Sequence, residues 1–141
     1  MSKATEAVVR RFYEEGVNNR DATALDATVT PDFAMHSPLL GELRGAAAYK
    51  EAALGFLTAS PDFKATVQDI VATDDKAAAR ILYKGTDTAG LAGEPTNKAF
   101  TLTATYVFRL ANGKLAEAWQ EVDRLGMLQQ LGAIPQPGAS S

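Results

Sequence analysis

The chain has 141 residues, of which 46% are hydrophobic and 22% charged, and this fits one globular domain with one core. Its net charge of −3 and the lack of any run of Lys or Arg argue against a nucleic-acid or anionic-membrane partner, because such partners usually require a basic patch. It contains no cysteine, which excludes disulfides, thiolate catalysis and Cys-ligated metal sites.

The first third of the chain is patterned as helix. Residues 3–19 place Val8 and Phe12 four positions apart on one apolar face, which predicts an amphipathic helix. Its start is polar, without the apolar core of a signal peptide, and no stretch approaches the roughly 18 apolar residues of a membrane span. We therefore expect a cytoplasmic protein. Asp21 is positioned to cap a second helix over residues 22–29.

A short strand and a third helix come next. Residues 33–36 favour a strand that ends at His36, the only histidine of the chain. A single histidine cannot form a multi-His metal site, so we interpret His36 either as a hydrogen-bond donor in a pocket or as the plain end of the strand. Residues 44–59 predict a helix whose apolar stripe includes Phe56.

The second half of the chain favours β structure. Residues 63–72 and 77–85 are rich in β-formers and flank a polar turn, so they predict a hairpin. Its register pairs Asp69 with Arg80 on the outer face. Residues 86–97, with two glycines and a proline, predict a loop.

A second hairpin is predicted around Asn112-Gly113, the strongest short-range turn signal in the chain, which separates strands over residues 100–110 and 115–123. Three N-terminal helices followed by a four-strand antiparallel meander define an α+β domain over residues 1–135. Residues 136–141 are assigned to a flexible C-terminal tail.

Alternation along the second hairpin sets its expected register. If Leu110 pairs with Leu115, stepping outward pairs Tyr106 with Trp119 and places Asp123 at the far end of the same face. The apolar face then carries Phe100, Leu102, Ala104, Tyr106, Phe108, Leu110, Leu115, Trp119 and Asp123. A phenol and an indole N–H on this face could orient a substrate oxygen, or the two rings could simply pack in the core.

Asp123 and Glu121 are thereby predicted to lie deep on an apolar face, where an unpaired charge is expensive. In the functional interpretation, burial raises the pKa of Asp123 and suits it to general acid/base catalysis. In the structural alternative, Asp123 only ends the strand, and pairs with Arg124 or caps the turn at Gly126-Met127. Both interpretations remain open at this point.

The residues of the second hairpin resemble a known family. Residues 113–132, Gly-Lys-Leu-Ala-Glu-Ala-Trp-Gln-Glu-Val-Asp-Arg-Leu-Gly-Met-Leu-Gln-Gln-Leu-Gly, are similar to the C-terminal signature of SnoaL-like polyketide cyclases, which belong to the nuclear transport factor 2-like superfamily. Further pieces agree in order and spacing: Phe12-Tyr13-Glu14-Glu15, Pro31-Asp32-Phe33, His36-Ser37-Pro38, Pro61-Asp62-Phe63, Gly85-Thr86, Phe108-Arg109 and Asn112-Gly113-Lys114. The resemblance covers nearly the whole chain.

This resemblance implies a cone-shaped fold, with a curved antiparallel sheet around a long helix and a deep internal pocket. It implies ring closure of a polyketide by intramolecular aldol condensation without metal or cofactor. The family's pocket carboxylate falls on Asp123, and a donor that is often His falls on Tyr106. Glu121 stands where the family usually has an apolar residue.

The expected function is therefore a cofactor-independent acid/base enzyme acting on a small apolar carbonyl compound, with Asp123 as the proton shuttle. The residues expected to contact the substrate are Tyr106, Trp119, His36, Glu121, Tyr13 and Phe56. One alternative is a non-catalytic small-molecule-binding or accessory protein on the same fold. Another is an epoxide hydrolase-like enzyme, which would need an Asp-Arg-Asp group in the pocket, whereas Asp69 and Arg80 are predicted outside. The polar outer face of the sheet suggests a homodimer or a higher homo-oligomer.

Overall fold

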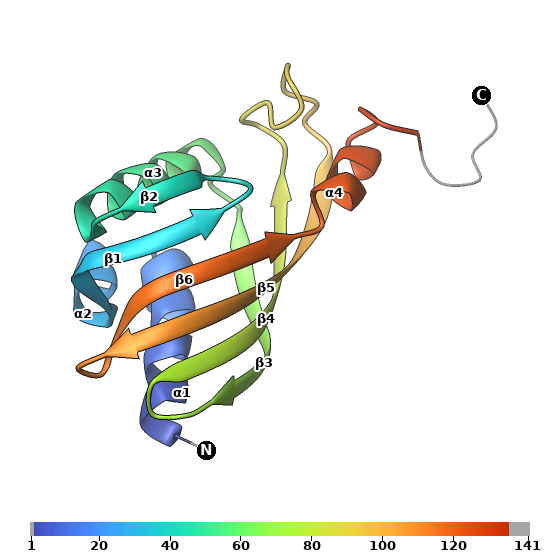
Figure 1. Cartoon of the computed structure of the whole chain (residues 1–141). Coiled ribbons are helices and arrows are strands. Elements are labelled where there is room, and N and C mark those ends of the chain that lie inside the picture. The colour runs from blue at the N-terminus through green and yellow to red at the C-terminus, as the bar shows by residue number, and fades with distance from the viewer. Residues whose placement is uncertain (1, 136–141) are drawn as a thin grey trace.

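A curved six-stranded sheet wraps around the N-terminal helix (Figure 1). The computed structural model describes residues 2–135. Its strands are β1 (Val29–Ser37), β2 (Gly41–Arg44), β3 (Lys64–Ala72), β4 (Lys76–Thr86), β5 (Ala99–Ala111) and β6 (Lys114–Val122). Its helices are α1 (Lys3–Arg11), the π-helix η1 (Phe12–Val17), α2 (Ala22–Thr28), α3 (Ala46–Ala59) and α4 (Arg124–Gln130). The predicted α+β class is confirmed, and the tail assigned to residues 136–141 lies outside the described residues.

The predicted meander of β3, β4, β5 and β6 is confirmed, but the sheet extends further. The strand order is β2-β1-β6-β5-β4-β3, and β1 pairs with β6 in parallel, so the sheet is mixed rather than purely antiparallel. The sheet is also open, with β2 and β3 at its edges. β2 and α4 were not predicted, because β2 has only four residues and α4 begins where the hairpin strand was expected to end.

The first helix changes its winding halfway. Ser2 caps α1 by accepting a hydrogen bond from the backbone N–H of Thr5, at 3.1 Å. From Phe12 the helix continues as the π-helix η1, in which the consecutive side chains of Phe12 and Tyr13 are both buried. Single π turns of this kind are frequent at functional sites. In this chain the π turn directs two aromatic rings toward the concave face of the sheet.

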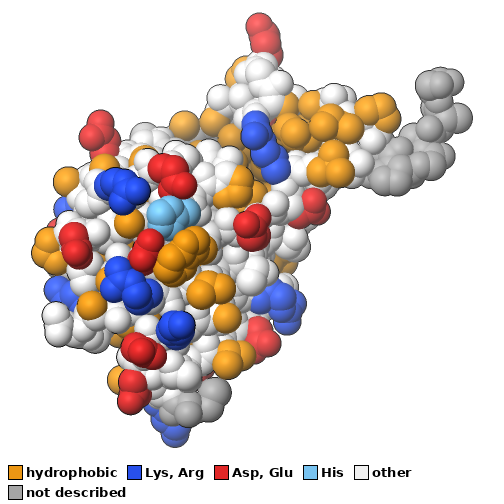
Figure 2. All heavy atoms as spheres, in the orientation of Figure 1, with side chains coloured by type: hydrophobic (Ala, Val, Ile, Leu, Met, Phe, Trp, Pro, Cys, Tyr) orange, Lys and Arg blue, Asp and Glu red, His pale blue; other side chains and the backbone are white. Residues whose placement is uncertain are grey.

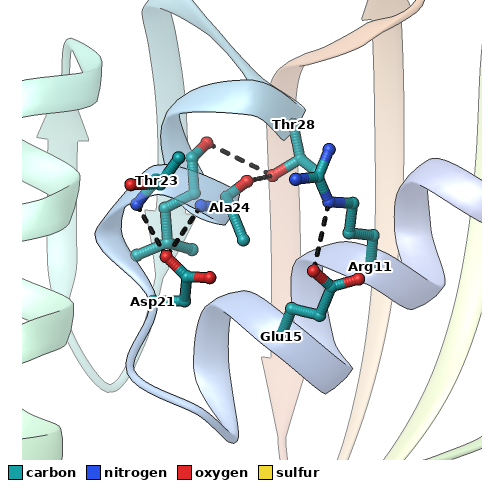
Figure 3. A network of polar contacts seen from close by, with 7 residues as sticks. Arg11, Glu15, Asp21, Thr23, Ala24 and Thr28 are labelled. Carbon is teal, nitrogen blue, oxygen red and sulfur yellow. Dashed lines mark hydrogen bonds and ion pairs between the residues drawn. The ribbon is translucent and has the colours of Figure 1, made fainter.

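The reversal between η1 and α2 depends on polar caps (Figure 3). The Asp21 carboxylate accepts hydrogen bonds from the backbone N–H groups of Thr23 at 2.9 Å and Ala24 at 3.2 Å, so the predicted cap is confirmed. Gly16 allows the close approach of α2, since a Cβ at this position would lie 2.5 Å from the Leu25 side chain. The tight reversal places α2 against η1, and α2 leads directly into β1.

A β-bulge interrupts each hairpin. In the first, Ile70 pairs with Ala79 as predicted, but Gln68 is an extra residue, and Val67 rather than Gln68 pairs with Ile81. A bulge of this kind inserts one residue into one strand and bends it. The predicted register of the first hairpin is therefore correct only between the bulge and the turn.

The second bulge has larger consequences. Leu110 pairs with Leu115 as predicted, but Ala116 is an extra residue in β6. Tyr106 therefore pairs with Gln120 and not with Trp119. Because side chains alternate along a strand, one inserted residue exchanges the two faces for the rest of β6.

The core lies on the concave side of the sheet and is rich in aromatic rings. Tyr106 and Phe108 on β5 stack with ring centroids 5.6 Å apart, and Phe12 meets Phe108 edge-on at 6.2 Å. Phe33 and Tyr49 extend this cluster toward α3, at 5.2 Å. Within residues 2–135, no helix combines the length and apolar character needed to cross a membrane.

Candidate functional site

A small cavity lies between the concave face of the sheet, α3 and the turn that joins β1 to β2. Its volume is about 50 Å³, and its wall includes Leu39, Leu40, Phe56, Tyr83, Tyr106 and Gln120. Every residue of its wall is apolar or uncharged. An apolar cavity that holds benzene measures about 150 Å³. A larger ligand therefore requires part of this wall to move.

A chain of hydrogen bonds crosses the polar side of this cavity. The side-chain amide nitrogen Nε2 of Gln120 donates to the Tyr106 hydroxyl at 2.6 Å. The Tyr106 hydroxyl is in turn hydrogen-bonded to the hydroxyl of Tyr83, and the Ser37 hydroxyl donates to Oε1 of Gln120. All four residues are buried, so we call Ser37, Gln120, Tyr106 and Tyr83 the inner polar chain.

Four strands bring the inner polar chain together. Tyr106 on β5 and Gln120 on β6 are cross-strand partners, and the bulge at Ala116 is what turns Gln120 inward. Tyr83 lies on β4, the other neighbour of β5, and Ser37 ends β1 beside β6. The chain thus depends on the register of the second hairpin.

The tyrosines of this region are held neutral. Burial raises the pKa of Tyr106, and burial together with the nearby Tyr106 raises the pKa values of Tyr13 and Tyr83 well above the ordinary value of 10.0. Desolvation disfavours the phenolate because the charged form loses its hydration. These hydroxyls therefore act as hydrogen-bond donors and acceptors at physiological pH, and not as bases.

The protons of the tyrosine pair can be counted. Tyr83 and Tyr106 carry one hydroxyl proton each, and their mutual hydrogen bond uses only one of them. The bond from Gln120 supplies a further proton to Tyr106 and takes none away. One hydroxyl proton of the pair is therefore left for another acceptor.

Tyr13 is an unsatisfied polar group beside this pair. Its side chain is fully buried, and its hydroxyl makes no hydrogen bond of normal geometry among the described residues, although it lies near enough to Tyr106 for that hydroxyl to contribute to its raised pKa. Its ring meets that of Tyr106 edge-on, with centroids 5.5 Å apart. An unsatisfied buried hydroxyl costs about 1–3 kcal/mol. The core next to the cavity therefore retains unused hydrogen-bonding capacity.

Three of the predicted site residues lie at or beside the cavity. Tyr106 and Phe56 form part of its wall, and Tyr13 is buried directly behind Tyr106. All three residues precede the bulge at Ala116 in the chain. The shift in register within β6 therefore does not change the direction of their side chains.

The predicted inward positions of Asp123, Glu121 and Trp119 are wrong, because the extra residue Ala116 turns the odd-numbered side chains that follow it outward. Trp119 is 43% exposed, and Glu121 is exposed on the same outer face. Asp123 is exposed and caps α4, where its carboxylate accepts a hydrogen bond from the Gly126 N–H at 2.9 Å. The structural alternative for Asp123 is confirmed in its turn-capping form, and the burial that supported a catalytic role is absent.

His36 also lies away from the cavity, on the outer face of the sheet. Nδ1 of its ring is 2.5 Å from Oε2 of Glu42 on β2, and Nε2 is 2.7 Å from Oε2 of Glu117 on β6. These hydrogen bonds, first that of Glu117 and then that of Glu42, raise the pKa of His36. Figure 2 shows the histidine in pale blue between acidic side chains. We call His36, Glu42, Glu117 and the adjoining Arg109 the outer ionic cluster.

A metal site is not formed by these side chains. Within residues 2–135, no group of three or more His, Asp and Glu side chains is arranged to hold a metal ion.

The sequence prediction missed three residues of the site, namely Gln120, Tyr83 and Ser37. A signal for the first was present: Leu115 and Ala116 are adjacent and both apolar, which breaks the alternation just after the turn. A bulge there would have placed Gln120 inside. Ser37 carries no such signal, because its neighbour β6 is distant in sequence.

Comparison with known proteins finds a family and several similar folds. The model of the family described as SnoaL-like polyketide cyclase matches residues 7–131. IdmH from Streptomyces antibioticus, a candidate polyketide cyclase, is 29% identical with a TM-score of 0.80, covering 91% of this chain and 98% of its own. TsrD from Streptomyces laurentii is 26% identical with a TM-score of 0.82, covering 95% and 99%.

A third similar structure has a different assignment. AclR from Streptomyces galilaeus, a candidate hydroxylase, is 25% identical with a TM-score of 0.78, covering 94% of this chain and 87% of its own. No curated protein matches the sequence significantly.

Proposed function

This chain belongs to the SnoaL-like polyketide cyclase family, and from that premise we propose a cofactor-independent enzyme acting on a small, largely apolar carbonyl compound held in the cavity. The observation that carries the proposal is the inner polar chain, which sets a neutral donor pair, Tyr83 and Tyr106, in a largely apolar and uncharged wall. Ligand pockets in general bind by apolar contact and orient the ligand with a few polar groups, and this cavity would take that form once part of its wall has moved.

The spare proton of the tyrosine pair defines the chemistry proposed for the site. It would be donated to the carbonyl oxygen of the ligand, where negative charge develops when the neighbouring carbon loses a proton or when the carbonyl carbon is attacked. Donors fixed in a water-poor site stabilise such charge more than water does. Tyr106 and Tyr83 would therefore act on the carbonyl oxygen.

We propose no residue of the cavity wall as the base that accepts a substrate proton, because every residue of that wall is apolar or uncharged. Asp123, the base that the family resemblance implies, caps α4 on the outside. In the proposed mechanism, the tyrosine pair donates a hydrogen bond to the carbonyl oxygen, as expected for acid/base catalysis. The substrate proton is removed by water or by another group of the substrate.

The same uncharged wall favours a second function, a small-molecule-binding protein without catalysis. Both functions predict that the cavity prefers a ketone to a hydrocarbon of the same shape. They differ in whether the protein changes the bound ketone.

The test uses phenylacetone and its isostere 2-methyl-3-phenylpropene, in which a methylene group replaces the carbonyl oxygen. Titration followed by NMR should show tighter binding of the ketone by roughly 2- to 10-fold, the effect of one net hydrogen bond. The double variant Tyr83→Phe/Tyr106→Phe, which removes both hydroxyl protons, should abolish the preference, and Asp123→Asn, a change outside the cavity, should retain it. Equal binding of the two probes to the wild type would rule out the carbonyl site.

Exchange of the α-hydrogens of phenylacetone in D2O separates the enzyme from the binding protein. Polarisation of the carbonyl acidifies these hydrogens, so the enzyme hypothesis predicts faster exchange in the presence of wild type than in the presence of the double variant Tyr83→Phe/Tyr106→Phe. Binding without faster exchange would support the non-catalytic function instead.

A further inference from the structure

We propose that Ser37 is a positioning residue that fixes the side-chain amide of Gln120 and thereby makes the cavity select ligands with an acceptor oxygen. This inference rests on the proposed function, because it concerns how the same tyrosine pair comes to hold a spare proton. It assigns a role to the end of β1, a segment distant in sequence from both tyrosines.

The hydroxyl of Ser37 has one available direction for its proton. Its oxygen accepts hydrogen bonds from the backbone N–H groups of Leu39 at 3.0 Å and Leu40 at 2.8 Å. A serine hydroxyl has two acceptor lone pairs and one proton. With both lone pairs engaged, it can only donate to its third partner, the side chain of Gln120.

This requirement determines which end of the Gln120 amide faces Ser37. Amide oxygen and nitrogen have nearly the same shape, so their assignment must follow from their partners. Because Ser37 donates, the group facing it must be the acceptor Oε1, and Nε2 is left to face Tyr106, to which it donates at 2.6 Å.

The orientation of the Gln120 amide decides whether the tyrosine pair keeps a hydroxyl proton that it can donate to a ligand. With Nε2 toward Tyr106, the pair receives a proton and keeps one of its own free, as counted above. With the amide reversed, Oε1 would accept the proton of Tyr106 while Tyr83 donates to Tyr106, and none would remain. The first state suits a carbonyl ligand and the second does not.

Ser37 also connects the orientation of the Gln120 amide to residues of the cavity wall. The two N–H groups that occupy its lone pairs belong to Leu39 and Leu40, whose side chains form part of that wall. The turn between β1 and β2 therefore holds the serine in its donating state. Loss of the hydroxyl would release the amide of Gln120 without changing either tyrosine.

The experiment compares wild type, Ser37→Ala and Ser37→Thr with the two probes used above, the ketone carrying a 13C label at its carbonyl. In wild type, the infrared carbonyl stretch of bound phenylacetone should lie below its value in hexane, because a hydrogen bond weakens the C=O bond. Ser37→Ala should lose this shift, and its ketone preference should fall from roughly 2- to 10-fold toward unity. Ser37→Thr, which retains a hydroxyl, should restore both.

A measurement on the wild type alone covers the case in which Ser37→Ala does not fold. Nuclear Overhauser contacts should place the side-chain amide protons of Gln120 against the ring of Tyr106. Contacts to the β-protons of Ser37 instead would show the reversed amide and overturn the inference.

The remaining outcomes separate this inference from the proposed function. If wild type prefers the ketone and Ser37→Ala shows the same preference and the same infrared shift, Ser37 does not position the site, whereas the carbonyl site stands. If wild type itself shows neither preference nor shift, both ideas fail.

Discussion

The two faces of the sheet carry polar groups of opposite kinds where β1 meets β6. On the inner face, Ser37 and Gln120 belong to a buried chain of neutral groups. On the outer face, the preceding residues of the same strands, His36 and Trp119, stack with ring centroids 5.5 Å apart beside carboxylates. One residue along each strand separates a neutral environment from an ionic one.

The difference shows what burial permits. A charge without a partner is costly in the core, so the inner face holds amide and hydroxyl groups whose hydrogen bonds are mutual. On the outer face, water screens the charges, and His36 can lie between Glu42 and Glu117. Which residues of β6 meet which environment depends on one inserted residue, Ala116.

Loss of one residue beyond the bulge should have the largest effect. Deletion of Ala118 would turn Trp119 and Glu121 into the core, or would absorb the bulge and turn Glu117 into it, unless β6 loses its pairing. Burial of an unpaired carboxylate costs several kcal/mol, so we expect a loss of more than about 4 kcal/mol in the free energy of unfolding, measured by urea titration and circular dichroism. Deletion of Ala116 is the matched control, because it removes the bulge while Gln120 still pairs with Tyr106 and faces inward. Near-native stability of the Ala118 deletion variant would mean that the two faces are interchangeable.

Truncation of neighbouring residues on the two faces should show the next largest contrast. Gln120→Ala takes one hydrogen-bond partner away from each of the buried hydroxyls of Ser37 and Tyr106, and should destabilise the fold by about 1–3 kcal/mol. Trp119→Ala removes a side chain that is 43% exposed and should cost less than about 1 kcal/mol. Thermal or urea unfolding of both variants would test the contrast, and a larger loss for Trp119→Ala would reverse it.

Asp123 offers a smaller effect on the outside. Asp123→Ala removes the N-cap of α4 and should cost about 1 kcal/mol of stability, whereas Asp123→Asn should cost little, since Asn is also a good N-cap. Neither variant should change the binding of phenylacetone, because Asp123 does not line the cavity. A selective loss of binding or turnover in Asp123→Asn, at unchanged stability, would restore the catalytic role that the sequence suggested.

The outer ionic cluster should give the smallest effect, through pH. Its hydrogen bonds raise the pKa of His36 above the ordinary value of 6.5. Protonated His36 therefore stabilises the fold fully below about pH 6.5, and this contribution is lost as the pH rises through the raised pKa. The difference in unfolding free energy between wild type and His36→Gln should fall by up to about 1 kcal/mol across that range. A His36 pKa at or below 6.5, measured by proton NMR, would contradict the cluster.

Much of the fold could be predicted from local pattern. The caps, the Asn112-Gly113 turn and the alternation of β5 each act within a few residues, and each appears in the structure. The parallel pairing of β1 with β6 could not be predicted in this way, because its partners lie about eighty positions apart and neither strand marks the other.

The site was predicted only up to the bulge. Tyr106 and Phe56 were placed correctly because alternation and helical periodicity fix their faces before Ala116 intervenes. Beyond it, the strict alternation assumed for β6 assigned Trp119 to the position that Gln120 occupies. A family signature gave the fold in spite of this error, since the signature depends on which residues are present and not on which face they take.

The stacking of Trp119 on His36 gives the protein an internal optical reporter. The chain has one tryptophan and one histidine, and they are in contact. Indole emission is quenched more strongly by an imidazolium ion than by a neutral imidazole ring. The intrinsic fluorescence of the unlabelled protein therefore reports whether the His36 ring is protonated. His36 and Trp119 directly precede Ser37 and Gln120 of the inner polar chain, so the signal comes from a site next to the cavity.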